Sequence, residues 1–333
     1  MTAESVQGLA YEPVLTDRPP LRAVRVPPPR AVLVAIGGWA AFALPLIVAL
    51  VAVRTPHWLP YLERAGFEMR LRDVGTGDTP LVGVVARMTS GGQQGNHPGP
   101  LSFYLMWPAY RLFGASAWAM QAAVVSMHLA AVGLALWLGA RRGGRALVLG
   151  LALAVVLVAQ GVGMSVLVDP WNPFLSLLWF LAFLVAVWSV VDGDLAGLPV
   201  AVLAGSVCAQ GHVEYVPFLV GAAVAVGGVL ALRWWRALRG PAWPAVRGDR
   251  LRLPVWGVAT AALGVVLWLP PVLDELRRTP GNLAIIRGQF TAADAPPAIG
   301  LWAEAYHGER FVERLRGMFA LALWDDSRRR LVL

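Results

Sequence analysis

Long apolar runs without charge constrain the fold of this chain more than any other feature. Several exceed the roughly 18 residues that suggest a bilayer crossing. Of the 333 residues, 57% are hydrophobic and only 14% are charged. A water-soluble domain carries about 25% charged residues, so most of this surface is expected to face lipid. Backbone amides in lipid must be hydrogen-bonded internally, and the runs are too long for barrel strands. The chain is therefore predicted to be an all-α polytopic membrane protein.

Seven membrane-spanning helices are predicted from these runs, the fifth being short and holding Gln210 near its end. They cover residues 31–53, 116–139, 145–167, 173–191, 195–211, 214–234 and 253–270. Residues 1–30 contain six prolines, four arginines and no apolar stretch of the kind that cleavable signal peptides have. They are predicted to form a disordered cytoplasmic tail, and the first span is predicted to act as an uncleaved anchor.

The arginines predict the orientation of the chain. All 28 Lys/Arg positions are arginine, and 13 of them lie in segments 1–30, 141–145 and 233–252, whereas the short loops 169–173 and 211–215 contain none. Seven alternating spans put these segments on one side, which the positive-inside rule makes the cytoplasm. The chain is thus expected in the plasma membrane with its N-terminus inside. The same alternation exports residues 54–115, 169–173, 210–215 and everything after 269. No basic stripe with interleaved aromatic residues is present, so the net charge of +8 does not indicate nucleic-acid binding.

The long exported loop 54–115 contains the candidate catalytic residue. A carboxylate just outside the bilayer, such as Asp73, can act as general base toward a sugar or lipid hydroxyl; alternatively it pairs with a neighbouring arginine or caps a turn. His97 precedes a proline, where it is either a turn residue or a ligand or proton shuttle. Residues 101–113 include Tyr104 and are aromatic-rich but too short to span, which predicts an interfacial helix.

These segments resemble the glycosyltransferase C superfamily, and more narrowly an actinobacterial branch of integral membrane proteins. The resemblance covers roughly residues 30–290. Its motifs are Arg72-Asp73-Val74-Gly75, Thr79-Pro80-Leu81-Val82-Gly83, His97-Pro98-Gly99-Pro100-Leu101, Tyr110-Arg111-Leu112-Phe113-Gly114, Asp169-Pro170-Trp171-Asn172-Pro173, Gln210-Gly211-His212-Val213-Glu214-Tyr215, Leu269-Pro270-Pro271 and Pro280-Gly281-Asn282-Leu283.

The resemblance implies an enzyme that transfers a sugar from a polyprenyl phosphate on the extracytoplasmic face. The acceptor would be a cell-envelope glycan or lipid. By position the catalytic base would be Asp73, with Glu68 as second choice. The implied substrate-binding residues are His97, Tyr104, Trp171, Asn172, Gln210, His212 and Tyr215, with Arg277 or Arg278 meeting the lipid phosphate. Interfacial anchoring for the aromatic residues and packing for His212 stay open as alternatives. No cofactor and no metal are expected.

The C-terminal residues have a different sequence pattern from the apolar runs before them. After a linker at 291–301, residues 302–333 resemble part of the glutaminase domain of asparagine synthetases, through Leu315-Arg316-Gly317-Met318-Phe319-Ala320 and Trp324-Asp325. They predict an amphipathic helix and a short strand. That domain uses a cysteine directly after the initiator Met, and position 2 here is threonine. We therefore expect a truncated fragment without amidotransferase activity, arising by gene fusion or frameshift.

Two other functions compete with sugar transfer. A transporter or flippase would place polar or ionisable groups at mid-membrane, and the nearly charge-free spans argue against it. A non-catalytic or defective membrane protein is the other alternative, since the C-terminal fragment points to a fused gene. A soluble asparagine synthetase is excluded by the apolar spans. The single Cys208 excludes an internal disulfide.

Overall fold

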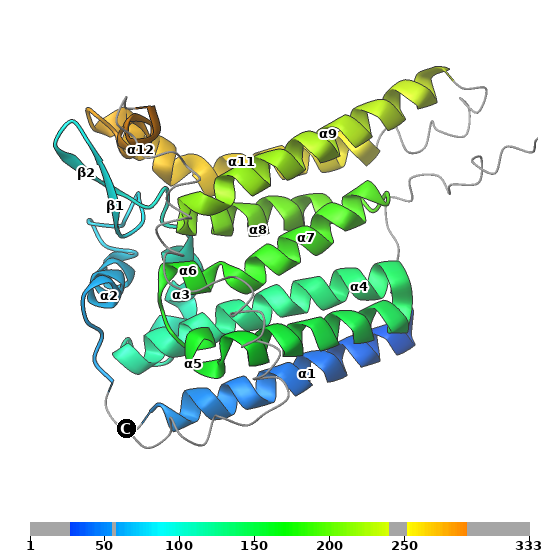
Figure 1. Ribbon diagram of the computed structural model, residues 1–333, viewed down its shortest axis with the longest axis horizontal. Helices are drawn as coiled ribbons and strands as arrows, with labels where there is room; N and C mark the ends of the chain where they lie inside the picture. The colour runs from blue at the N-terminus through cyan, green and yellow to red at the C-terminus, as the bar shows by residue number, and fades with distance from the viewer. Residues whose placement is uncertain (1–26, 55–57, 240–251, 292–333) are drawn as a thin grey trace, which may run out of the picture.

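The computed structural model is a bundle of long helices that carries shorter elements at one end (Figure 1). It describes residues 27–54, 58–239 and 252–291. Most of the predicted tail and linker, and all of the predicted fragment 302–333, lie outside these residues. The long helices are α1 (Pro29–Ala52), α4 (Ala117–Val162), α7 (Leu177–Val191), α8 (Gly197–Gly211), α9 (Val216–Arg239) and α11 (Arg252–Arg277).

Five helices in the described ranges are long and apolar enough to cross a membrane. They are α1, α4, α7 with the preceding turn α6 (Asn172–Leu175), α9 with the preceding turn η1 (Val213–Tyr215), and α11. Helix α8 is apolar but shorter. The prediction of a predominantly α-helical membrane protein is thereby confirmed.

Helix α4 contains the sharpest change of direction. At 46 residues, a straight helix would be about 69 Å long, more than twice the roughly 30 Å of a bilayer core. Gly144 has φ 60° and ψ −148°, a conformation that only glycine adopts readily, and it divides α4 into two arms. The two arms pack so closely that a Cβ atom added at Gly139 in the first arm would lie 2.6 Å from the Leu151 side chain in the second. After the second arm, α5 (Met164–Leu167) continues toward the end of the bundle that carries the shorter elements (Figure 1).

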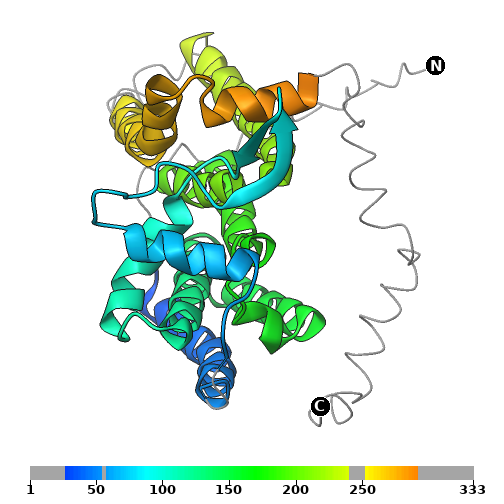
Figure 2. The same cartoon turned by 90° about the vertical axis from the view of Figure 1, so that its left-hand side faces the viewer.

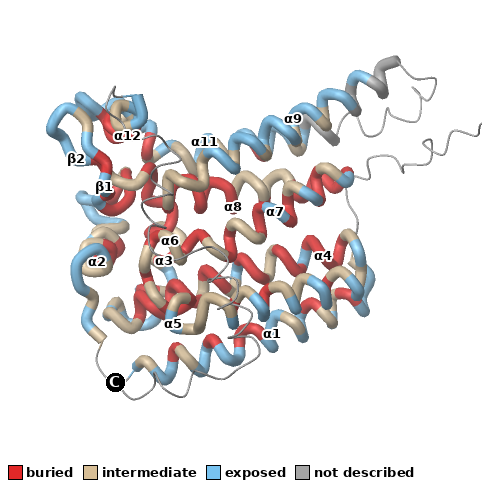
Figure 3. Tube along the Cα trace, viewed as in Figure 1, coloured by how far each residue is buried: buried red, intermediate tan, exposed pale blue. Residues whose placement is uncertain are grey.

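The burial pattern distinguishes a buried protein core from an exposed apolar surface (Figure 3). The core lies between α1, α3 (Leu101–Leu112), α4, α7 and α8, where Phe42, Leu46 and Met120 are buried. Helix α9 is instead largely exposed: Val220 and Val224 keep 56% and 70% of their surface accessible. A large apolar face of this kind is unfavourable in water, whereas lipid chains can cover it.

The shorter elements lie together over one end of the bundle, and we call this group the polar cap. It comprises α2 (Glu63–Asp73), β1 (Val85–Ser90), β2 (Gln93–Asn96), α3 (Leu101–Leu112) and α12 (Asn282–Thr291), with the segments 168–175 and 212–215. Figure 2 looks onto this end and shows α2, the hairpin and α12 lying across the ends of the long helices.

The cap adds a short β-hairpin to the otherwise helical fold. Strands β1 and β2 form an antiparallel hairpin around Gly91 and Gly92, which both have positive φ. Ala86 and Met88 on one face of β1 pack against Ile286 of α12. The predicted stretch 101–113 forms helix α3, and the largest buried side chains of this helix belong to the bundle core.

Candidate functional site

The first turn of α2 binds the loop at residues 169–171. The Arg64 guanidinium donates from Nε and Nη2 to the two carboxylate oxygens of Asp169, at 2.6 and 2.5 Å. This hydrogen bonding raises the pKa of Arg64. The Trp171 indole N–H donates to Glu63 Oε2 at 2.5 Å. Trp171, which the resemblance implies is a substrate-binding residue, therefore binds α2, and two loops far apart in sequence form one surface.

Glu68 is buried and already paired. Its Oε1 accepts from Arg72 Nη2 at 2.7 Å and lies 3.1 Å from the Tyr110 hydroxyl of α3. Arg72 Nε also donates to the Tyr110 hydroxyl. The hydrogen bond to Glu68 is the main cause of the raised pKa of Arg72. Glu68 therefore holds α2 against α3, which makes it a poor second choice as catalytic base.

Asp73, the last residue of α2, differs from the other acidic residues of this helix. Its side chain is half-buried, and among the described residues it has no hydrogen-bond or ion-pair partner. Its backbone carbonyl accepts from the hydroxyl of Thr76 at 2.7 Å and of Thr79 at 3.4 Å. The threonines thus fix the turn after α2 through the backbone, and the Asp73 carboxylate stays uncommitted.

His97 and His212 lie together, although the chain separates them by more than a hundred residues. Their ring centroids are 5.3 Å apart. Burial, aided by the neighbouring His212, lowers the pKa of His97 to about 4. Burial also lowers the pKa of His212, while Glu214, whose Oε2 lies 3.7 Å from His212 Nδ1, and Glu63 oppose this shift. Both rings are therefore neutral near pH 7.

This pair predicts that acid destabilises the cap. Between pH 6.5 and about 4 the unfolded chain protonates His97 while the folded chain does not, so stability falls as the pH drops through this window. At about 1.4 kcal/mol per pKa unit, the free energy of unfolding falls by on the order of 3 kcal/mol across this window because of His97. Thermal unfolding in detergent from pH 7.5 to 4.5 should show a steeper loss for wild type than for His97→Gln. Equal slopes would contradict the prediction.

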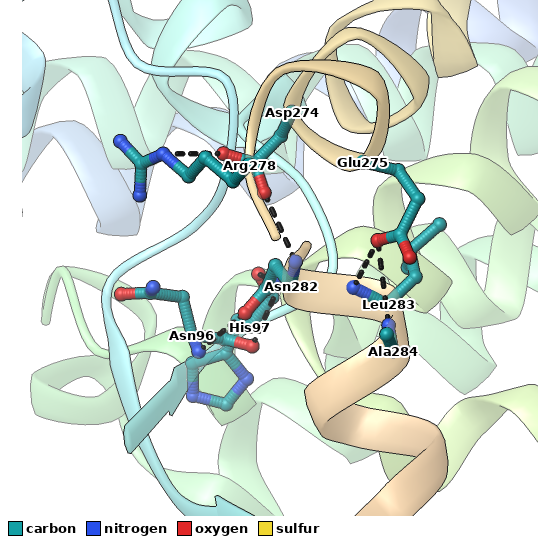
Figure 4. A network of polar contacts seen from close by, with 8 residues as sticks. All are labelled: Asn96, His97, Asp274, Glu275, Arg278, Asn282, Leu283 and Ala284. Atoms are coloured by element: carbon teal, nitrogen blue, oxygen red, sulfur yellow. Dashed lines mark hydrogen bonds and ion pairs between the residues drawn. The ribbon is translucent and has the colours of Figure 1, made fainter. Parts of the chain in front are cut away.

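Asn282, the first residue of α12, joins the C-terminal side of the described chain to β2 (Figure 4). Its Oδ1 accepts from the Asn96 backbone N–H at 2.7 Å, and its Nδ2 donates to the carbonyls of Asn96 and His97 at 3.2 and 3.4 Å. Its own N–H donates to Asp274 Oδ2 at 3.0 Å. Asp274 also pairs with Arg278 at 3.2 Å, so this predicted phosphate ligand, one residue past the end of α11, is engaged by a carboxylate of α11.

A second carboxylate completes this junction. Glu275 Oε2 accepts from the backbone N–H groups of Leu283 and Ala284, at 2.9 and 3.3 Å. Carboxylates are favourable at a helix N-terminus, where backbone N–H groups lack partners. The neighbouring Arg277 is exposed. Helix α12 is thereby fixed to both α11 and the hairpin.

Gln210 occupies a fully buried position between three helices. Its Nε2 donates to the Leu267 carbonyl of α11 at 2.8 Å, and its Oε1 accepts from the Leu101 N–H at the start of α3 at 3.2 Å. A Cβ at Gly99 would meet this amide at 2.1 Å. Both ends of the Gln210 amide are therefore used in packing the cap onto the bundle.

The remaining predicted binding residues also lie at the cap end. The Tyr104 hydroxyl donates to the Pro80 carbonyl, and burial raises its pKa. The Tyr215 ring lies 5.1 Å from that of Phe180. Asn172 is buried, and its Oδ1 has no hydrogen-bond partner in the part of the chain that is described.

The cap gathers the predicted residues into two places. Trp171, His97 and His212 lie near the first turn of α2, where Glu63 influences His212 and binds Trp171. Asp73 ends the same helix, about 15 Å along the axis at about 1.5 Å per residue. Within the described ranges, no three His, Cys, Asp or Glu residues are arranged to hold a metal ion.

Sequence reasoning missed several residues that organise the cap. Glu63 and Arg64 begin α2, and an acidic residue in a first helical turn was an available signal. Asp274, Glu275 and Asn282 gave no such signal, because their partners depend on how α12 folds back.

Comparison with known proteins adds one finding. A family described as the glutamine amidotransferase domain matches residues 284–333. The match supports the resemblance of the C-terminal segment to the glutaminase domain of asparagine synthetases, and it begins inside α12 rather than at residue 302. It does not reach residues 1–283, so the glycosyltransferase C resemblance there stays a prediction. No curated protein and no solved structure matches the chain.

Proposed function

We propose that the chain is a membrane glycosyltransferase that uses a polyprenyl-phosphate-linked sugar at the polar cap. The observation that carries the proposal is that the Asp73 carboxylate has no hydrogen-bond or ion-pair partner among the described residues. Of the three acidic residues on α2, Glu68 is paired with Arg72, and Glu63 is bound by Trp171. Asp73 alone is half-buried without a partner among the described residues. A carboxylate left free beside a bilayer is suited to accept a proton.

The proposed step is an inverting displacement. Asp73 takes the proton from an acceptor hydroxyl as the hydroxyl oxygen attacks the anomeric carbon of the donor sugar. The bond between that carbon and the phosphate oxygen breaks, and the polyprenyl phosphate leaves with the electron pair. The acceptor is a glycan or lipid of the cell envelope. Trp171 binds Glu63 in the first turn of α2, and His212, next to His97, is influenced by the same glutamate. Because this turn lies about 15 Å along α2 from Asp73, we propose that these residues contact a part of the acceptor or donor away from the reacting hydroxyl.

This proposal includes a topology of seven crossings with the cap outside the cell. The two arms of α4 count separately, and α8 counts as a crossing. The proposal is supported by two ion pairs away from the cap: Arg141 with Asp194 and Arg142 with Asp192. They join the turn in α4, which the arginine pattern assigns to the cytoplasm, to the α7–α8 turn, which the alternation of seven spans puts on the same side.

Cysteine labelling tests the orientation. The only cysteine, Cys208, is fully buried, so a Cys208→Ala background is suitable. We introduce Gly77→Cys in the exposed turn after α2, or Ala146→Cys in the exposed α4 turn. In intact cells a membrane-impermeant maleimide should label position 77, and it should label position 146 only after permeabilisation. The reverse pattern would put Asp73 in the cytosol and remove the proposal.

A transporter is the second candidate, and His128 favours it. This residue is fully buried in α4, and neither ring nitrogen has a hydrogen-bond partner in the described part of the chain. An ionisable residue within a membrane span is often part of a transport path. The two functions respond differently to Asp73→Asn, because a transport path through α4 does not require a base on α2.

A further inference from the structure

A pocket lies between α2 and the β1–β2 hairpin. Its volume is ≈ 460 Å³, within the roughly 300–1,000 Å³ typical of small-ligand sites. The residues around it come from one helix and two strands of the exported loop: Leu62, Glu63, Gly66, Arg70, Val84, Val85, Ala86, Arg87 and Gln94. Asp73 is not among them.

The wall from α2 is one face of the helix. Leu62, Gly66 and Arg70 follow at intervals of four residues, the spacing that places side chains above one another. A Cβ added at Gly66 would have nothing within 4 Å. The glycine therefore leaves the middle of this wall open, and the Arg70 side chain borders the hollow one turn further on.

The wall from β1 follows from the alternation of the strand. Ala86 and Met88 point toward α12, so Val85 and Arg87 belong to the opposite face. Arg87 is exposed, and it borders the same pocket as Arg70. Two guanidinium groups from separate elements thus border one small volume.

These two arginines lack a partner among the described residues, as do Arg111 and Arg287 of the cap, but only Arg70 and Arg87 border this pocket. Arg64, Arg72 and Arg278 each form an ion pair with a carboxylate. Neither Arg70 nor Arg87 forms a hydrogen bond or ion pair with any described residue. Guanidinium groups present planar sets of N–H donors that match phosphate and carboxylate oxygens. The pocket therefore offers positive charge and donors that the protein itself does not use.

We propose that this pocket binds a phosphate group carried on a small hydroxylated molecule. Arg70 and Arg87 hold the phosphate oxygens, and Gln94 and the second carboxylate oxygen of Glu63 are available to the hydroxyl groups. The phosphate belongs either to a lipid headgroup at the bilayer surface or to a soluble phosphate ester. The site stands whether or not the chain transfers sugar, because its residues exclude Asp73.

Two binding measurements on the full chain test the site and identify the source. Purified protein in detergent is titrated with glycerol 3-phosphate by calorimetry. Separately, protein extracted from vesicles of phosphatidylglycerol and phosphatidylcholine is analysed by native mass spectrometry for retained phosphatidylglycerol. The variants are Arg70→Gln, Arg87→Gln and Gly66→Leu, the last of which fills the hollow without changing charge. Arg111→Gln is the matched control, an exposed cap arginine outside the pocket.

Each pocket variant should weaken binding by about tenfold or more, as expected for losing a hydrogen bond to a charged group or the space for the ligand. Arg111→Gln and Asp73→Asn should bind as wild type, which separates this site from the proposed catalytic step. An effect on glycerol 3-phosphate alone assigns a soluble ligand, and one on lipid retention alone assigns a headgroup. The proposal is overturned if neither measurement depends on Arg70 and Arg87, if Gly66→Leu binds normally, or if Arg111→Gln loses as much.

Discussion

Asp73→Asn is expected to abolish sugar transfer while leaving the amount and stability of the protein unchanged. A positioned general base contributes about 10²- to 10⁴-fold to a rate, and asparagine cannot accept the proton. The substitution nearly preserves the shape of the side chain and disturbs no described contact of the carboxylate. The measurement is transfer from a labelled polyprenyl-phosphate sugar by membranes containing equal amounts of each variant.

Two further acidic residues provide the controls for this experiment. Asp78 is exposed in the turn that follows α2, so Asp78→Asn changes the same charge nearby and should keep full activity. Glu68→Gln weakens the contact with Arg72 and should lower the melting temperature. If Asp73→Asn transfers sugar at the wild-type rate, Asp73 is not the base.

The spans could be predicted from sequence because hydrophobicity in a membrane is a local property. A continuous apolar run must form a helix in lipid whatever its neighbours do. The predicted span 31–53 and the helix Pro29–Ala52 differ by only one or two residues at each end. The predicted break between 139 and 145 contains Gly144, where the backbone reverses. Neither the first helix nor this break depends on knowing which residues form the protein core.

The cap was harder to predict because its elements are short and depend on one another. The alternation of Ala86, Arg87 and Met88 before Gly91 and Gly92 was a hairpin signal, but it extends over few residues. Helix α12 has no long apolar run, and its N-terminus is stabilised by Glu275 from the helix before it. Its position follows from tertiary contacts, which no single window of sequence contains.

The candidate site shows the same limit at the level of single residues. The sequence directed attention to the loops that it predicts to be exported, and it named Asp73 and Glu68 in one of them. It could not show that Glu68 is paired with Arg72 while Asp73 is not, since both stand near arginines in the chain. Nor could it show that the Gln210 amide is used by α3 and α11. These residues differ in their hydrogen-bond partners, and the tertiary fold determines which groups become partners.

Removing one charge of the Arg141–Asp194 pair is expected to destabilise the bundle by about 3–5 kcal/mol. The guanidinium donates from Nε and Nη2 to the two carboxylate oxygens, both at 2.9 Å, and the side chains are 5% and 0% exposed. Asp194 also accepts from the Ala196 N–H at 3.2 Å. In Asp194→Asn the arginine stays buried with its charge uncompensated. Thermal unfolding in detergent measures the loss.

A neighbouring pair provides a graded comparison. Asp192, whose side chain is 56% exposed, pairs with Arg142, whose side chain is only 2% exposed, so Asp192→Asn should cost less than Asp194→Asn because water reaches the carboxylate position. Combining Arg141→Met with Asp194→Asn should recover most of the stability, because no unpaired charge remains in the interior. A double variant as unstable as Asp194→Asn alone would mean that packing, and not charge, joins the α4 turn to the α7–α8 turn. Charge compensation would then no longer explain why these two turns lie together.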